Sequence, residues 1–109
     1  MIGIDVVDIG EIDEKKLTRI LSPIEKEYLD KSTNSDRRRE VMAGIFACKE
    51  AVFKALECDS LGLEILKDIV IDHEQNGRPY VIFKGSRIPM KLSVSHSKST
   101  AVAVAINLA

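Results

Sequence analysis

The sequence predicts a single α+β domain in which a long central helix packs on a small, mainly antiparallel sheet. Three observations carry this prediction: alternating apolar residues at both ends of the chain, one long apolar helical pattern at its centre, and an Asn-Gly turn between two strand patterns. The chain has no internal repeat, low-complexity segment or linker, so residues 1–109 are assigned to one domain.

The first strand is predicted over residues 2–9, because its residues alternate between two faces. Asp5 therefore projects from a mostly apolar strand, on the same face as a glycine. A short helical pattern follows over residues 11–21. A second helix is predicted over residues 23–31, because a Ser-Pro dipeptide supplies its N-cap and first-turn proline and an acid follows at the capping-box position.

The central helix is predicted to begin at residue 35 or 36, after a polar connection, and to end at residue 56 or 57. Large apolar side chains cover more than half of its circumference, and alanine and glycine fill most of the rest. We therefore expect a largely buried helix.

The remaining elements are a short helical turn and four strands. The sequence predicts them over residues 61–66, 69–71, 80–83, 90–95 and 101–106. In the last strand alanines alternate with larger residues, so one face is thin enough for a helix or a second subunit to approach closely.

Composition excludes several classes of function. The net charge is only −1, with a pI near 6.1, so no global field recruits nucleic acid or an anionic membrane. No stretch approaches the ~18 apolar residues that span a bilayer, and the N-terminus has no signal pattern. Cys48 and Cys58 stand about 15 Å apart along one helix and its end, beyond disulfide reach. We expect a cytoplasmic protein with reduced thiols that binds neither nucleic acid nor membrane.

The pair Glu50 and Lys54 shares one face of the central helix, next to small alanines. An exposed ion pair is the commonest use of this spacing, and it contributes only ~0.2–0.5 kcal/mol. The alternative is a functional carboxylate and ammonium beneath open space. Asp5 leaves similar alternatives, because an acid on an apolar strand reaches solvent, pairs with a base or holds a metal.

Two more residues are unusual for their positions. Lys49 lies among large apolar side chains of the helix, where an ammonium is costly unless it extends to solvent or meets an anion. His96 ends a strand on its apolar face, either as a core-edge histidine or as a phosphate contact beside a turn rich in hydroxyls and amides. The chain has no Cys/His metal motif and no glycine-rich phosphate loop. The residues alone therefore indicate no more than a candidate phosphate site.

Three segments together resemble holo-acyl-carrier-protein synthases, the short type of the 4'-phosphopantetheinyl transferase superfamily. They are Ile-Gly-Ile-Asp-Val-Val at residues 2–7, Phe-Ala-Cys-Lys-Glu-Ala-Val-Phe-Lys-Ala at residues 46–55, and Ser-Val-Ser-His at residues 93–96. The resemblance covers nearly the whole chain. It implies transfer of the 4'-phosphopantetheine group from coenzyme A to a serine of an apo acyl carrier protein, with release of adenosine 3',5'-bisphosphate, in fatty acid biosynthesis.

The resemblance also implies a magnesium site. Asp5 and Glu50 would bind Mg²⁺, with the coenzyme A pyrophosphate and water completing its shell. Lys54 would neutralise pyrophosphate oxygens and protonate the leaving group. The serine proton would pass either to Glu50 or to a metal-bound water, and the resemblance does not choose between them.

Further residues would bind coenzyme A by the same resemblance. His96 would contact its phosphates, and Lys49 would help to hold the nucleotide or the site. Gly77 and Pro79, in the hairpin, would contact the nucleotide. Ile45 stands where many relatives carry an arginine near these phosphates, so that contact is absent or comes from another residue.

The resemblance implies a homotrimer with active sites between subunits, and an acidic acyl carrier protein as partner. Glu11 stands where an arginine is common at the carrier-docking surface, and it would repel such a partner. Basic residues from the early helices are the docking candidates: Lys15, Lys16, Arg19, Arg37, Arg38 and Arg39. The run of arginines at residues 37–39 opens a helix whose dipole disfavours positive charge, so it needs either an external acidic partner or neighbouring acids.

Two other functions compete with this one. A metal-dependent phosphohydrolase would use Asp5, Glu50 and Lys54 without any carrier protein. A non-enzymatic α+β interaction module would use none of these residues for chemistry. Three separated motifs in the matching order favour the transferase over both.

Overall fold

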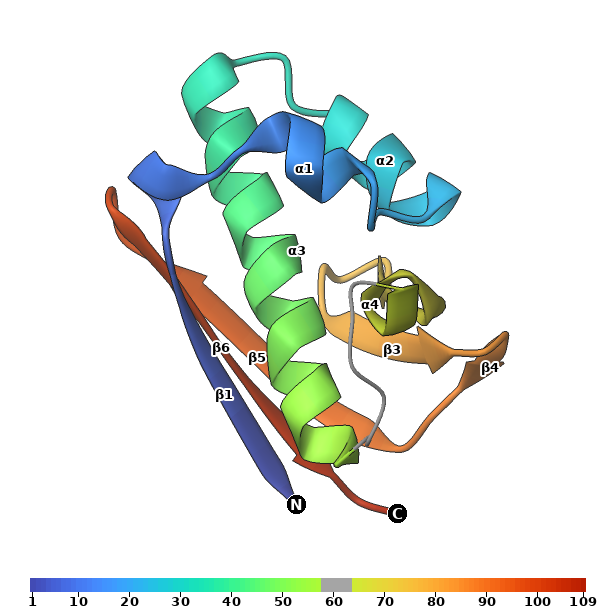
Figure 1. Cartoon of the computed structure of the whole chain (residues 1–109). Helices are drawn as coiled ribbons and strands as arrows, with labels where there is room; N and C mark the ends of the chain where they lie inside the picture. The colour runs from blue at the N-terminus through green and yellow to red at the C-terminus, as the bar shows by residue number, and fades with distance from the viewer. Residues whose placement is uncertain (58–63) are drawn as a thin grey trace.

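The computed structural model describes residues 1–57 and 64–109 and confirms the α+β class. Helix α3 (Ser35–Leu56) crosses the molecule, with one three-stranded sheet on one side and a second sheet with α2 on the other (Figure 1). The sequence predicted one sheet, but two form, because alternation identifies strands without saying which strands pair. Cys58 and part of the turn predicted at residues 61–66 lie outside the described residues.

The first sheet is antiparallel throughout, and its order is β1-β6-β5. Its strands are β1 (Ile2–Asp8), β6 (Thr100–Asn107) and β5 (Met90–His96). Its inner face lies against α3. The three alanines of β6 on that face are at most 1% exposed, which confirms the prediction of a thin face that a helix approaches closely: Ala101, Ala103 and Ala105.

Gly3 sets the distance between β1 and α3. A Cβ placed on it would collide with the backbone carbonyl of Ala51, so the strand and the helix touch without a side chain between them. Asp5, two residues further along β1, faces the same helix. The close approach thus brings the first candidate carboxylate against the helix that carries the others.

The segment after β1 is shorter and more broken than the predicted helix over residues 11–21. A 3₁₀ helix, η1 (Ile9–Glu11), precedes the single turn α1 (Glu14–Thr18). Asp8 and Asp13 interrupt the pattern, because their carboxylates accept hydrogen bonds from backbone amides at the start of η1 and of α1.

Helix α2 (Pro23–Asp30) forms as predicted, with its capping box complete. The Ser22 hydroxyl accepts from the amide of Glu25, and the Glu25 carboxylate accepts from the amide of Ser22 at 2.8 Å. Beyond this local role, Glu25 is entirely buried. An acid with no exposed area must have a partner inside the molecule.

The second sheet has the order β2-β3-β4 and follows the short helix α4 (Glu64–Asp68). Its strands are β2 (Ile69–His73), β3 (Pro79–Phe83) and β4 (Ser86–Arg87). The predicted Asn-Gly turn joins β2 to β3, with Gly77 at a φ of 90°. The two-residue β4 was not predicted, because it is too short to show alternation.

On the outer face of the first sheet, β1 and β6 are apolar, whereas β5 presents Lys91, Ser93 and Ser95. Ile2, Ile4 and Val6 are between 54% and 67% exposed, and they pair with the valines and isoleucine of β6 that share this face. In residues 1–57 and 64–109, no helix combines the length and the apolarity that are needed to cross a membrane. A contiguous exposed apolar surface is typical of an interaction site.

Candidate functional site

Three predicted residues meet where β1 crosses α3. The Lys54 ammonium donates to the backbone carbonyl of Ile4 at 2.9 Å and to Asp5 Oδ1 at 3.3 Å. Glu50 lies one turn earlier on the same face of α3. The Lys54 side chain is 51% exposed and the Asp5 side chain 18% exposed. The ammonium is thus held by β1 while it stays open to solvent.

The Asp5 carboxylate acts on Glu50. Partial burial raises the pKa of Glu50, the negative charge of Asp5 raises it further, and Lys54 offsets only part of this effect. A cation between the carboxylates would relieve the repulsion, and hard carboxylate oxygens suit Mg²⁺. Among the described residues, no group of three or more His, Cys, Asp or Glu side chains forms a metal site. Two carboxylates are fewer ligands than Mg²⁺ takes, so an ion held by Asp5 and Glu50 would take its other ligands from substrate and water.

A cavity of about 450 Å³ opens beside these carboxylates. Asp5, Glu50 and Phe46 form its floor, and the segment after β1 forms a wall through Asp8, Glu11, Ile12 and Asp13. Sequence reasoning identified only Glu11 in this wall. The signal for the other two acids was their helix-capping position, which sequence reasoning did not connect with a site.

Lys49 is placed differently from the sequence-based expectation. It is 0% exposed, and its ammonium donates to Glu25 Oε1 at 2.6 Å and to the backbone carbonyl of Ile69. Glu25 Oε2 accepts from the backbone amide of Ile71 at 2.8 Å. Burial lowers the pKa of Lys49, and Glu25 opposes that shift. An ammonium buried in this way does not contact a nucleotide, so the expectation of a direct ligand contact is corrected. The alternative, that Lys49 helps to hold the site, stays a prediction.

His96 lies away from the Asp5 cavity, in a hollow of about 110 Å³ on another face of α3. Its Nε2 is 3.3 Å from the Arg37 guanidinium, and its Nδ1 is 3.5 Å from the Glu40 carboxylate. Ile45, which replaces the expected arginine, lines the same hollow. Arg37 therefore supplies a guanidinium beside His96.

The hairpin residues Gly77 and Pro79 line an open groove of about 650 Å³ between the second sheet and β5. Val94 lines both this groove and the His96 hollow, so the two are adjacent. No described residue that lines either of them also lines the Asp5 cavity. The chain thus divides the predicted site residues into two halves, with Asp5, Glu50 and Lys54 in one and His96, Gly77 and Pro79 in the other.

The arginine run at the start of α3 makes bonds within the chain. Arg38 forms ion pairs at 2.9 Å with Glu14 of α1 and with Asp30 of α2. Arg39 donates to backbone carbonyl oxygens around η1. Of the two alternatives for this run, Arg38 follows the one of neighbouring acids, and Arg39 bonds to backbone oxygens instead. Both guanidinium groups hold the N-terminal segments in place, and docking of a carrier by these arginines stays a prediction.

The fold and the site together define a class of protein: a small α+β domain that presents two carboxylates and an ammonium at a strand–helix crossing, in a form suited to a metal and a phosphate. The family model of the 4'-phosphopantetheinyl transferase superfamily matches residues 1–107. The chain belongs to this superfamily.

Individual relatives agree with this assignment. A holo-[acyl-carrier-protein] synthase of Staphylococcus carnosus is 38% identical over 112 residues, which cover 96% of this chain and 93% of the relative. A holo-(acyl-carrier-protein) synthase from Bacillus anthracis, solved in complex with CoA (3',5'-ADP), superposes with a TM-score of 0.78 at 36% identity, covering 95% of this chain and 91% of the other. The Helicobacter pylori synthase, solved with coenzyme A, also gives 0.78, at 32% identity, covering 97% of this chain and 98% of the other.

Proposed function

We propose that this protein transfers the 4'-phosphopantetheine group of coenzyme A to a serine of an apo acyl carrier protein. The observation that carries the proposal is the crossing of β1 and α3, where Asp5, Glu50 and Lys54 converge beside an open cavity. Relatives at 32% to 38% identity over nearly the whole chain are named as synthases of this kind, and two of them were solved with coenzyme A or its nucleotide.

Asp5 and Glu50 are the residues that would hold Mg²⁺. The ion would supply positive charge to the pyrophosphate during transfer. Lys54 is half exposed and bonded to only two oxygens, so its ammonium can turn toward a phosphate while its stem stays on α3. There it would stabilise the charge that develops on the leaving nucleotide and donate a proton to it.

The separation of the predicted site residues into two halves supports a site shared between two copies of the chain. The apolar outer face of β1 and β6, which includes Ile2, Ile4 and Val6, offers a surface for a neighbouring subunit. In the homotrimer that we propose, one subunit contributes the Asp5 half and its neighbour contributes the His96 half. Arg37 would then take the place of the arginine that is missing at Ile45 and meet the phosphates beside His96.

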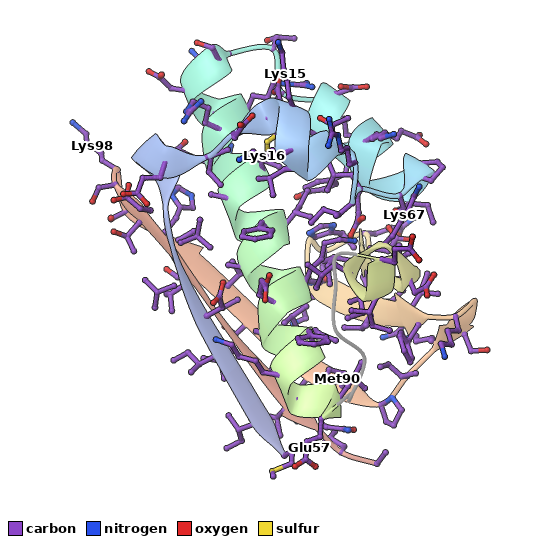
Figure 2. The ribbon with its side chains drawn as sticks, in the orientation of Figure 1. Lys15, Lys16, Glu57, Lys67, Met90 and Lys98 are labelled. Carbon is purple, nitrogen blue, oxygen red and sulfur yellow. The ribbon has the colours of Figure 1, made fainter. Side chains whose placement is uncertain are left out.

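The carrier would dock near α1. Lys15 and Lys16 project from this helix close to the N-terminal end of α3, whereas Glu57 lies at the opposite end (Figure 2). With Arg38 and Arg39 engaged inside the chain, Lys15, Lys16 and Arg19 remain as candidates to meet an acidic carrier. The acids beside the cavity oppose such a partner, so attraction depends on this one helix.

A mass assay tests the transfer directly. Purified protein is incubated with Mg²⁺, coenzyme A and an apo acyl carrier protein, and the carrier is weighed by mass spectrometry. We expect a carrier heavier by one phosphopantetheine group. Consumption of coenzyme A without a carrier would favour the phosphohydrolase. No reaction with several carriers, and no rise in melting temperature with coenzyme A, would favour the interaction module.

A complementation experiment tests the shared site. Glu50→Ala and His96→Ala should each be inactive alone, because each lacks one half. Co-expressed in equal amounts, they should recover about a quarter of the wild-type activity, since half of the sites carry an intact Glu50 and half of their neighbours an intact His96. Zero recovery in stable mixed oligomers would place both halves in one subunit.

A further inference from the structure

The wall of the Asp5 cavity is a turn with few bonds of its own. Helix η1 has three residues, and its internal hydrogen bond, from the Ile12 amide to the Ile9 carbonyl, measures 3.3 Å. The Asp8 carboxylate caps the Gly10 amide at 2.9 Å. Such a short 3₁₀ turn leaves most of its carbonyl oxygens without partners in the backbone.

Arg39 donates to the carbonyl oxygens of the turn from behind, in addition to the weak internal bond at Ile9. Its Nη2 donates to the carbonyl oxygens of Ile9 and Ile12, both at 3.0 Å, and lies 3.4 Å from that of Gly10. Ile9, Gly10 and Arg39 line a second cavity, of about 480 Å³. The turn thus separates two cavities, with the acidic one on its front and the guanidinium at its back.

Helix α3 connects this guanidinium to the candidate chemistry. Arg39, Phe46 and Glu50 occupy positions i, i+7 and i+11 and so share one face of the helix. Phe46 and Glu50 form the floor of the cavity whose wall Arg39 holds. Helix α3 therefore carries both the Glu50 carboxylate and the arginine that bonds to η1. Their positions are about 16 Å apart along the helix axis.

We infer that Arg39 is a positioning residue, which sets the opening through which the acceptor serine reaches Asp5 and Glu50 by holding η1 through its carbonyl oxygens. The inference rests on the proposed function. It concerns the acceptor more than coenzyme A. The pyrophosphate would also meet Asp5 and Glu50 through the ion, but the proposed nucleotide contacts lie in the His96 hollow and the hairpin groove, which share no described lining residue with η1. Lys54 and the two carboxylates sit on α3 and β1, whose regular hydrogen bonds hold them without Arg39.

If Arg39 positions the turn, its loss should lower activity toward the carrier and leave the KM for coenzyme A nearly unchanged, whereas a purely structural role would affect both substrates alike. Arg39→Ala frees the turn, so kcat/KM for the apo carrier should fall about 10-fold to 100-fold, since small misplacements of a reacting group have costs of this size. KM for coenzyme A should stay within about twofold of wild type. Arg39→Lys retains one charged donor group and should lie between the two. Lys67→Ala, on α4 and away from η1 (Figure 2), removes an exposed cation and should match wild type.

A second readout does not depend on activity. Hydrogen exchange at the Gly10 and Ile12 amides should be faster in Arg39→Ala than in wild type, while exchange in the middle of α3 stays unchanged. If Arg39→Ala does not fold, Arg39→Lys carries the same comparison. Unchanged exchange in the turn, or equal losses for carrier and coenzyme A, would overturn the inference. Wild-type protein that modifies no carrier would instead refute the proposed function, and the exchange data would still decide whether Arg39 holds the turn.

Discussion

Two lysines of the same helix form ion pairs with opposite properties. Lys49 pairs with Glu25, and both side chains are 0% exposed. Lys54, five residues later on another face of α3, pairs with Asp5, and its side chain is 51% exposed. The sealed ammonium has its donors committed to a carboxylate and a strand carbonyl. The open ammonium can change partners. The comparison separates a lysine that holds the fold from one that is available for chemistry.

The largest change in the free energy of unfolding should follow from breaking the buried pair of Lys49 and Glu25. Lys49→Met leaves the Glu25 carboxylate buried without its cation, so the free energy of unfolding should fall by about 3–5 kcal/mol. The same change at the open position, Lys54→Met, should alter it by less than about 1 kcal/mol. Urea denaturation of the two variants measures the difference directly. Equal losses at both positions would remove the distinction between the pairs.

The reactivity of Cys48 measures how well the buried side of α3, next to Lys49, is protected from solvent. Burial raises the pKa of this thiol to about 12, with a further contribution from Glu25. A raised pKa means less thiolate at any lower pH, so at pH 8 the Cys48 thiol should be alkylated about 10³-fold more slowly in the folded protein than in urea. The rate is measured with iodoacetamide in a Cys58→Ser background. Rapid alkylation under native conditions would show that this side of α3 opens readily.

The exposed pair of Lys54 and Asp5 should affect the rate of phosphopantetheine transfer and not the stability of the fold. Lys54→Met removes the ammonium beside Asp5, and transfer should slow about 100-fold, the usual cost of losing one group that stabilises developing charge. Stability stays near wild type, so the loss is read from kcat of a folded protein. Lys67→Met provides the matched control, because it removes an exposed lysine from α4. A Lys54→Met enzyme of normal rate would make this pair an ordinary surface interaction.

The smallest effect concerns the carboxylates themselves. Without metal, Glu50→Gln should be at least as stable as wild type, because the substitution removes a partly buried charge that Asp5 repels. In the presence of coenzyme A, adding Mg²⁺ should raise the melting temperature of wild type by a few degrees, and this increment should be absent in Glu50→Gln. Thermal unfolding with coenzyme A, with and without Mg²⁺, measures both. A magnesium increment that survives in Glu50→Gln would remove Glu50 from the metal site.

Local signals predicted most elements of the fold. The capping box placed the start of α2, and the apolar periodicity placed α3 almost to the residue. The pairing of strands into two sheets was not predictable, since each strand pattern is local and pairing is not. Helix η1 was missed because two capping acids broke the helical pattern.

The site was predictable only in part, for a physical reason. The unfavourable position of Lys49 was visible in the sequence, but its partner Glu25 lies 24 residues away and already had a local role as a capping acid. The arginine run was expected to meet either an external acidic partner or neighbouring acids. The sequence does not decide between them, because the helices that Arg38 and Arg39 contact are placed by tertiary packing. Short-range patterns show that a charge needs a partner, and the folded chain decides which one.

The buried pair of Glu25 and Lys49 also substitutes for a missing strand. Strand β2 is the edge of its sheet, and its outward amide at Ile71 and carbonyl at Ile69 bond to the carboxylate and the ammonium. An unpaired edge is a template on which other chains add strands and aggregate. Two charged side chains close this edge where a further strand would otherwise lie. A variant that loses the pair should therefore become prone to aggregation as well as less stable.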